Sequence, residues 1–296
     1  MVRYRVVGSD RTALLPGHIK LAKPLGRGTF GKVFACHVTT SEGSLAMAIK
    51  QFKEKPDTID IKMQKLISRH PIMKSGVLVP FKLAKCIWSG KLQWVHLMPK
   101  LEPVAPAGKW FYNRNLDAAA FALSCPAIFE RHGLTYPDIK PLNILKDPER
   151  KYSKTGYVLC DCDSALPLDC QITCYGSYPP WPTGPAPWQR NLPKDDDGNV
   201  DKQREKEIRD IFDEYMSRPR QLTHAMRFSA IATAYLFLGN IDSSEKNTLW
   251  VDRHELAIKA HDAFEAADMA EGIRDLNRLV ETTLSFDFPT ASDLVA

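Results

Sequence analysis

Three polar residues lie close together in a stretch that otherwise consists mainly of apolar residues and proline. Asp138, Lys140 and Asn143 occur within residues 134–145, Leu-Thr-Tyr-Pro-Asp-Ile-Lys-Pro-Leu-Asn-Ile-Leu. A carboxylate can orient a hydroxyl nucleophile, an ammonium group can neutralise a phosphoryl group, and an amide oxygen can bind magnesium. The types and spacing of these residues therefore indicate a site that handles phosphate and a divalent metal.

Two aspartates follow directly after an apolar run in the middle of the chain. The run Tyr-Val-Leu-Cys at residues 157–160 leads into Asp161, and Asp163 adds another carboxylate two residues later. Carboxylate oxygens are preferred magnesium ligands. The segment therefore offers hard oxygen ligands, and Asp163 either adds to metal binding or only stiffens the turn.

The same segment also allows a zinc site. Four cysteines fall within fifteen residues: Cys160, Cys162, Cys170 and Cys174. They are enough ligands for one zinc ion. The first two would point to opposite faces of a strand end, and no second C-x-x-C pair or histidine supports the site. Magnesium is therefore the favoured metal.

A glycine-rich turn near the N-terminus could hold phosphates. Residues 26–33 read Gly-Arg-Gly-Thr-Phe-Gly-Lys-Val, with runs of β-type composition on both sides. A dinucleotide-binding turn would need a helix after its last glycine. The segment is thus either a plain tight hairpin or a flap whose amides approach phosphates closely. Lys50, at the end of the apolar run Ala-Met-Ala-Ile-Lys, favours the flap.

Together these motifs resemble those of eukaryotic-type protein kinases. Residues 138–145 are similar to the kinase catalytic loop, with Tyr136 and Pro137 in place of the usual His and Arg. Leu-Cys-Asp-Cys-Asp-Ser-Ala is similar to the D-F-G segment, and Ala-Met-Ala-Ile-Lys resembles the V-A-I-K strand. The resemblance extends from about residue 18 to the C-terminus.

The resemblance implies a role for each of these residues. Asp138 would accept the proton of the substrate hydroxyl, and Lys140 would contact the γ-phosphate. Asn143 and Asp161 would bind Mg²⁺, and Lys50 would contact the α- and β-phosphates of ATP. The other residues that the resemblance assigns to ATP binding are Leu25, Gly26, Arg27, Gly28, Thr29, Phe30, Gly31, Lys32, Val33, Ala48 and Leu101.

The elements that must position the nucleotide are predicted before residue 102. Residues 57–70 have the pattern of a helix. On the kinase pattern, Asp60 is the acid of this helix best placed to pair with Lys50. A hairpin is predicted from residue 81 to residue 97. On the kinase pattern, Met98 would limit the depth of the adenine pocket, and the backbone of Pro99 and Leu101 would meet the adenine.

Helices are predicted for most of the later chain. A helix over residues 115–131 should begin at a capping Asn115 and stop at Gly133, directly before the polar stretch. Residues 201–218 predict a charged, exposed helix, residues 222–238 a buried helix, and residues 279–294 the last helices.

Several residues that kinases use for bracing are replaced. Pro137 stands in place of the arginine that helps bind an activation-loop phosphate, and Met226 in place of the helix aspartate that braces the catalytic loop. The glutamate of A-P-E and its arginine partner are also both missing. Losing both members of a buried pair can be nearly neutral, whereas losing one costs about 3–5 kcal/mol. We therefore expect a coherent fold that does not require activation-loop phosphorylation.

The whole chain is predicted to be an α+β protein with the two-lobed kinase fold. Residues 1–17 would be a short extension, residues 18–98 the β-rich N-lobe, residues 99–101 the hinge and residues 102–296 the mainly helical C-lobe, with ATP between the lobes.

The 296 residues are 44% hydrophobic and 25% charged, with a net charge of +5. These values are typical of a soluble globular protein.

The composition also bears on partners and compartment. Lys and Arg are spread along the chain, so nucleic-acid binding is not indicated. No apolar run approaches the roughly 20 residues that a membrane span needs. Seven cysteines fit free thiols better than a disulfide framework. We expect an intracellular protein, located in the cytoplasm or the nucleus, with the inside of a host cell as an alternative.

The predicted activity is ATP-dependent phosphorylation of serine or threonine in protein substrates, because Lys140-Pro141 resembles serine/threonine kinases. The main alternative is a pseudokinase that binds nucleotide or acts as a scaffold. A small-molecule phosphotransferase of similar fold is a third interpretation.

Overall fold

The chain forms an α+β structure that divides into two compact units. The computed structural model describes residues 6–7, 14–15, 19–27, 31–40, 43–52, 58–88, 91–104, 115–162, 165–168, 192–195, 197–216, 219–238 and 253–283. The first unit comprises Met1–Pro103 and Leu145–Asp163, and the second comprises Val104–Ile144 and Ser164–Ala296. The predicted α+β class is confirmed, and the predicted lobe boundaries stay a prediction.

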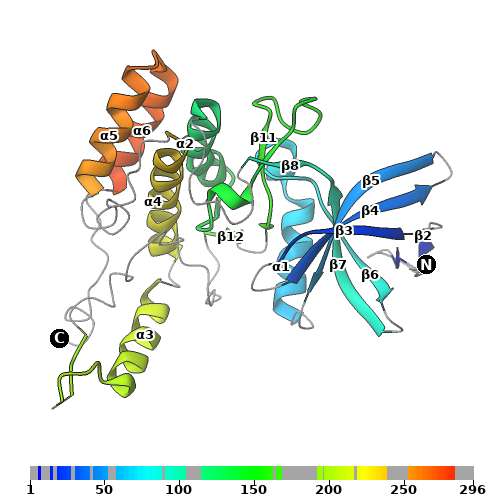
Figure 1. Cartoon of the computed structure of the whole chain (residues 1–296), viewed down its shortest axis with the longest axis horizontal. Helices are drawn as coiled ribbons and strands as arrows, with labels where there is room; N and C mark the ends of the chain where they lie inside the picture. Colours follow the sequence, from blue (N-terminus) through cyan, green and yellow to red (C-terminus); the bar gives the residue numbers. More distant parts are fainter. Residues whose placement is uncertain are drawn as a thin grey trace. The chain divides into compact units, whose positions relative to one another are not determined.

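An antiparallel sheet is the centre of the first unit. Among the described residues it has seven strands, in the order β2-β1-β6-β7-β5-β4-β3. Figure 1 shows the longer strands of this sheet in blue to cyan. Their bounds are β1 Val6–Val7, β2 Leu14–Leu15, β3 Ile19–Arg27, β4 Gly31–Thr40, β5 Gly43–Phe52, β6 Lys82–Trp88 and β7 Lys91–Pro99. The predicted hairpin after residue 81 is confirmed, since Lys82 pairs with Leu97 and Trp88 with Lys91.

The two faces of this sheet have separate apolar clusters because side chains alternate along each strand. On one face, Ile49 belongs to a cluster of Ile19, Cys36, Ile49, Ala84, Cys86, Val95 and Leu97. On the other face, Ala48 packs with Val79, Met98 and Val158. Lys50 lies two residues after Ala48 and therefore on this second face.

Helix α1 (Thr58–Arg69) follows β5 and confirms the predicted helix. Gln64 and Ile67, which are nearly one turn apart, are buried, whereas Lys62 and Leu66 are exposed. The buried side contacts the sheet directly, because Gln64 is hydrogen-bonded to His96 on β7. A short 3-10 helix, η1 (Pro71–Lys74), comes next along the chain.

A second, small sheet completes the first unit. Its order is β11-β10-β8, with bounds β8 Glu102–Pro103, β10 Ile144–Lys146 and β11 Tyr157–Leu159. Leu159 at the end of β11 also forms a parallel bridge with Leu78. The turn between β10 and β11 is held by Asp147, whose buried carboxylate accepts hydrogen bonds from the amides of Tyr152 and Ser153.

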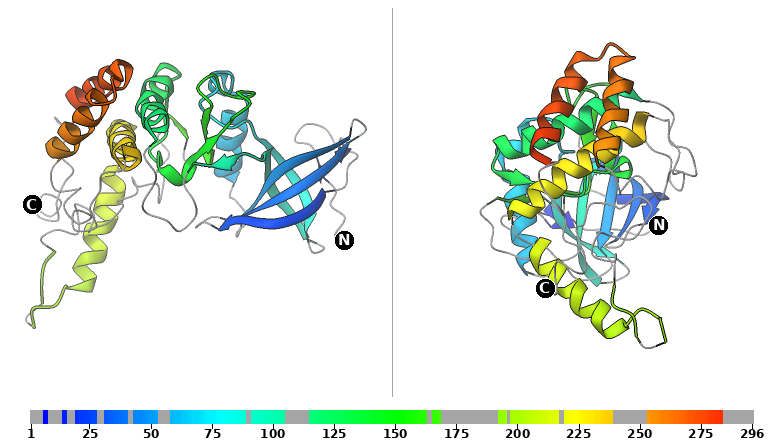
Figure 2. Two further views of the ribbon diagram at one scale, coloured as in Figure 1. Left: turned by 45° about the horizontal axis from the view of Figure 1, so that its top comes forward. Right: turned by 90° about the vertical axis from the view of Figure 1, so that its left-hand side faces the viewer.

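The second unit is mainly helical. Its helices are α2 Leu116–Arg131, α3 Lys202–Met216, α4 Pro219–Leu238, α5 Arg253–Glu265 and α6 Ala270–Thr283. Helix α4 packs along α2, and α5 and α6 lie side by side in both figures (Figures 1 and 2). The short strands β9 (Leu134–Thr135) and β12 (Leu166–Pro167) pair with each other.

Several predicted features of the helices are confirmed. The Asn115 side chain accepts a hydrogen bond from the amide of Ala118 at 3.0 Å and so caps α2. Gly133 ends that segment in the left-handed region, with a φ of 67°. Helix α4 is buried along almost its whole length, as predicted for residues 222–238.

Other helices differ from the prediction. The charged helix α3 is mostly exposed, but Ile208 and Phe212, one turn apart, are buried on one side. The last predicted helices at residues 279–294 correspond to α6, which begins at Ala270; residues 284–296 lie outside the described residues. Helix α5 was not predicted at all.

Candidate functional site

The polar stretch after β9 forms a rigid loop in the second unit. Tyr136 is fully buried, and its ring stacks on that of Phe129 of α2 with 5.3 Å between the centroids. The loop then enters the 3-10 helix η2 (Pro141–Asn143), where the Asn143 amide donates to the carbonyl of Lys140. Proline suits the first position of such a turn because it has no N–H to satisfy.

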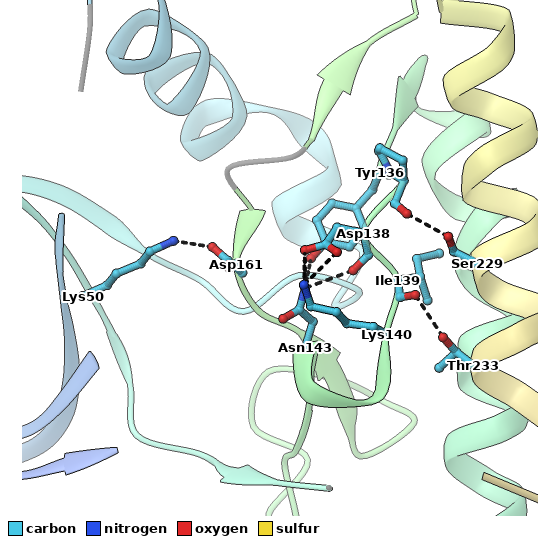
Figure 3. Close-up of polar contacts among 10 residues, drawn as sticks. Lys50, Tyr136, Asp138, Ile139, Lys140, Asn143, Asp161, Ser229 and Thr233 are labelled. Carbon is cyan, nitrogen blue, oxygen red and sulfur yellow. Dashed lines mark hydrogen bonds and ion pairs between the residues drawn. The ribbon is translucent and has the colours of Figure 1, made fainter. Parts of the chain in front are cut away.

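The structure brings Asp138, Lys140 and Asn143 together (Figure 3). The Lys140 Nζ donates to both carboxylate oxygens of Asp138, each at 2.8 Å. Asn143 Nδ2 donates to Asp138 Oδ2 at 2.9 Å, to the Asp138 carbonyl at 3.0 Å and to the Tyr136 hydroxyl at 3.2 Å. The Asp138 side chain is 13% exposed, so a small polar group could still reach it.

These bonds fix the orientation of the Asn143 side chain. Its Nδ2 makes all the side-chain hydrogen bonds that Asn143 forms with the described residues. The amide oxygen points away from Asp138 (Figure 3) and has no donor among those residues. This oxygen is therefore available as a ligand for a hard cation, which prefers oxygen donors.

Side chains of helix α4 form hydrogen bonds with the backbone of the loop. These contacts were not predicted from the sequence. Met226 Sδ accepts a hydrogen bond from the Tyr136 amide at 3.2 Å. Ser229 Oγ donates to the Pro137 carbonyl, and Thr233 Oγ1 donates to the Ile139 carbonyl, both at 2.9 Å. Position 226 thus contacts the loop through a methionine.

In the first unit, Lys50 on β5 forms an ion pair with Asp161 (Figure 3). The two residues are 111 positions apart in the sequence, and each was predicted from a different motif. The Lys50 side chain is 7% exposed and that of Asp161 is 33% exposed. The carboxylate is therefore tied to a buried cation while part of it still faces solvent. Asp161 also has a positive φ of 61°, which is uncommon for a residue with a Cβ.

The glycine-rich turn lies between β3 and β4. Leu25, Gly26 and Arg27 are exposed at the end of β3, while Gly31, Lys32 and Val33 begin β4. Gly26 pairs with Val33 and Arg27 with Lys32, which confirms a hairpin. The predicted residues between them, Gly28, Thr29 and Phe30, lie outside the described residues.

Gly31 is required by packing. A Cβ on this residue would lie 2.3 Å from the backbone oxygen of Gln51, far closer than a van der Waals contact allows. Gly26 has nothing within 4 Å of such a Cβ. The two glycines therefore differ. The neighbouring strand β5 explains why residue 31 is a glycine, but it does not explain Gly26.

Four of the residues predicted to bind ATP or to line its adenine pocket lie in one apolar cluster of the first unit. Ala48 and Met98 are buried and paired across β5 and β7. Val33 and Leu101 are half-buried and pack against the same cluster. Each of these residues is apolar, so the cluster could cover the faces of a planar aromatic ring.

Beside Lys50 lies a buried polar pair that the sequence did not reveal. His96 is directly opposite Lys50 on the neighbouring strand, and its Nε2 is 2.9 Å from Gln64 Oε1 of α1. The Phe52 ring lies 4.9 Å from the His96 ring, and the Phe81 ring lies 4.7 Å from it. Burial lowers the pKa of His96 from its ordinary value of 6.5 to about 3; Lys50 adds to this effect and Asp161 opposes it. His96 is therefore neutral at physiological pH.

Two predicted acids and the zinc alternative are left without a structural account. Asp60 belongs to α1, but its side chain is not among those described, and Asp163 lies outside the described residues. Cys160 is half-buried and Cys162 is buried, while Cys170 and Cys174 lie outside the described part.

The arrangement combines two kinds of chemistry. The first unit has a buried ammonium group tied to a partly exposed carboxylate, and the second has a carboxylate, an ammonium group and an oriented amide on one loop. In the first unit, these groups can bind a phosphate group and a hard cation. In the second unit, the carboxylate can accept a proton from a hydroxyl and the amide oxygen can bind a hard cation. Comparison with protein-family models finds no match to this chain, and comparison with curated proteins finds none either.

Proposed function

We propose that the chain is a protein kinase with the two-lobed kinase fold, which transfers the γ-phosphoryl group of ATP to serine or threonine residues of proteins. The observation that carries this proposal is the ion pair of Lys50 with Asp161. One residue was predicted to contact phosphates and the other to bind the metal. A phosphate-binding lysine and a metal-binding carboxylate must lie close together, because both act on the same phosphate groups.

The loop of the second unit supports the same activity. Asp138 is the base that orients the substrate hydroxyl and accepts its proton. Lys140, which contacts both oxygens of Asp138, supplies positive charge for the transferred phosphoryl group. Phosphoryl transfer depends mainly on positioning and charge stabilisation, so a loop whose side chains are fixed by one another suits this reaction.

The residues also fit Mg²⁺ in their chemistry. Asp161 offers a carboxylate that is partly exposed, and Asn143 offers an amide oxygen directed away from its own hydrogen bonds. Both are hard oxygen donors, as magnesium prefers. When bound, the ion would neutralise charge on the phosphates of ATP. Lys50 would add a second positive charge.

A nucleotide-binding protein without transfer activity is the second candidate. It is favoured by the absence of any glutamate from residues 56–87, the region in which kinases have the acid that pairs with the strand lysine. In such a protein, the Lys50–Asp161 pair would serve only to bind nucleotide.

None of the helices among the described residues has the length and apolar character needed to span a membrane.

The experiment that separates these candidates is transfer of labelled phosphate from ATP to a mixture of protein substrates. The wild type should label serine or threonine, while Asp138→Asn and Asp161→Asn should lower the rate by about 100-fold or more. Asp117→Asn is the matched control, because this aspartate is exposed in the first turn of α2. Equal labelling by wild type and Asp161→Asn would contradict the proposal. Binding of Mg-ATP without any labelling would support the second candidate.

A further inference from the structure

Helix α4 presents three buried side chains to the loop that contains Asp138. Met226, Ser229 and Thr233 are spaced by three and four residues, which places them on one face of the helix. Met226 is fully buried, and Ser229 and Thr233 are each 1% exposed. All three form a hydrogen bond with the backbone of the loop. Figure 3 shows the bonds of Ser229 and Thr233.

The contacts lie on both sides of Asp138. Met226 accepts from the amide of Tyr136, Ser229 donates to the carbonyl of Pro137, and Thr233 donates to the carbonyl of Ile139. The backbone is therefore fixed immediately before and immediately after the aspartate. A base must lie within hydrogen-bond reach of the proton that it accepts, so its rate depends on such fixation.

The chemistry of α4 matches the unusual sequence of this loop. Pro137 has no N–H, so residues 136 and 137 offer the helix one amide donor and two carbonyl acceptors. A neutral thioether accepts the single amide, and also lies 3.9 Å from the hydroxyl of Thr135. A carboxylate at position 226 would lack a second backbone donor and would be buried with its charge poorly compensated. Met226 and Pro137 are therefore compatible with each other.

We infer that Met226, Ser229 and Thr233 are positioning residues, which hold Asp138 in the orientation needed to accept the proton of the substrate hydroxyl. This inference rests on the proposed function and adds a support for its base. The three residues belong to the second unit, whereas Lys50 and Asp161 belong to the first. Removing one of the three contacts should therefore lower kcat by a much larger factor than it raises the KM for ATP.

The test uses variants that keep the volume of each side chain. Ser229→Ala, Thr233→Val and Met226→Leu should each lower kcat by about 10- to 100-fold. Thr233→Ser should have a kcat close to that of the wild type, unlike Thr233→Val, because serine keeps the hydroxyl group. Ser124→Ala is the matched control, since the Ser124 hydroxyl donates only to the carbonyl of Phe121 within its own helix.

A second measurement does not depend on activity. Met226→Leu removes the acceptor of the Tyr136 amide, so hydrogen exchange at this amide should become faster by at least about tenfold while exchange in α2 is unchanged. If folded variants keep their kcat and their exchange rates, the inference is overturned. If the wild type transfers no phosphate, the proposed function is wrong, whatever the exchange data show. If hydrogen exchange at the Tyr136 amide is also unchanged in Met226→Leu, the inference that α4 positions the loop is wrong as well.

Discussion

The buried His96 should make the stability of the protein sensitive to acid. Its side chain is 1% exposed and lies against Phe52, Phe81 and Gln64. In the folded protein its pKa is lowered from 6.5 to about 3 by burial and by the positive charge of Lys50, against a smaller opposing effect of Asp161. In the unfolded chain, His96 is expected to have its ordinary pKa.

The sign of the effect follows from this difference. Below pH 6.5 the unfolded chain takes up a proton at His96, and the folded protein does not do so until about pH 3. The free energy of unfolding therefore falls as the pH falls through this window, by up to about 1.4 kcal/mol per pH unit. From pH 8 to pH 5 the loss due to this one residue should be about 2 kcal/mol.

The perturbation is the double variant His96→Leu with Gln64→Leu. Replacing both partners avoids leaving a buried polar group without its hydrogen bond. Urea unfolding at pH 8, 7, 6 and 5 would give the free energy of unfolding of each protein. The wild type should lose about 2 kcal/mol more than the double variant between pH 8 and pH 5.

His37→Gln is the matched control, because this histidine is exposed on β4 of the same sheet. It should keep the pH dependence of the wild type. If the double variant loses stability as steeply as the wild type, His96 is not the responsible group. The reasoning from its burial would then be wrong.

The glycine turn and the segment after Asp161 allow two simpler tests. Gly31→Ala should destabilise the protein by about 1–3 kcal/mol in urea unfolding, because its Cβ would meet the Gln51 backbone; Gly26→Ala is the control, and equal losses would contradict the packing argument. Joint replacement of Thr173, Ser177 and Thr183 by alanine should leave phosphate transfer unchanged, because Pro137 cannot bind a phosphate as arginine would. Loss of transfer would show that phosphorylation of this segment is required.

Elements with a strong local pattern could be predicted from the sequence. The hairpin of β6 and β7, helix α1 and the start of α2 at Asn115 each have alternation, helical period or a capping side chain. Helix α5 had no such signal. Its buried residues include Ala257, Ala260 and Phe264, and two of these three are too small to make an apolar stripe conspicuous.

The candidate site divides in the same way. Asp138, Lys140 and Asn143 are close in the sequence, so their proximity in the structure was predictable from spacing alone. The contact between Gln64 and His96 could not be predicted from the sequence, because both residues are polar and only the packing of α1 on β7 buries them. Met226 was read as a core residue of a buried helix. Its contact with Tyr136 joins positions 90 residues apart, and no local pattern encodes it.

The buried side chains that connect α1 to β7, and α4 to the loop of Asp138, carry no charge. Gln64 and His96 connect α1 to β7, and α4 holds its loop through a thioether and two hydroxyl groups. By contrast, Glu130 and Arg227, which pair between α2 and α4, are 29% and 19% exposed. A buried ion pair must be desolvated, and loss of one partner leaves a charge uncompensated. Neutral side chains avoid the desolvation of a buried ion pair and the risk of an uncompensated charge. Under the proposed function, this chain can therefore hold its loop in place with Pro137 and Met226 while Asp138 still acts as the base.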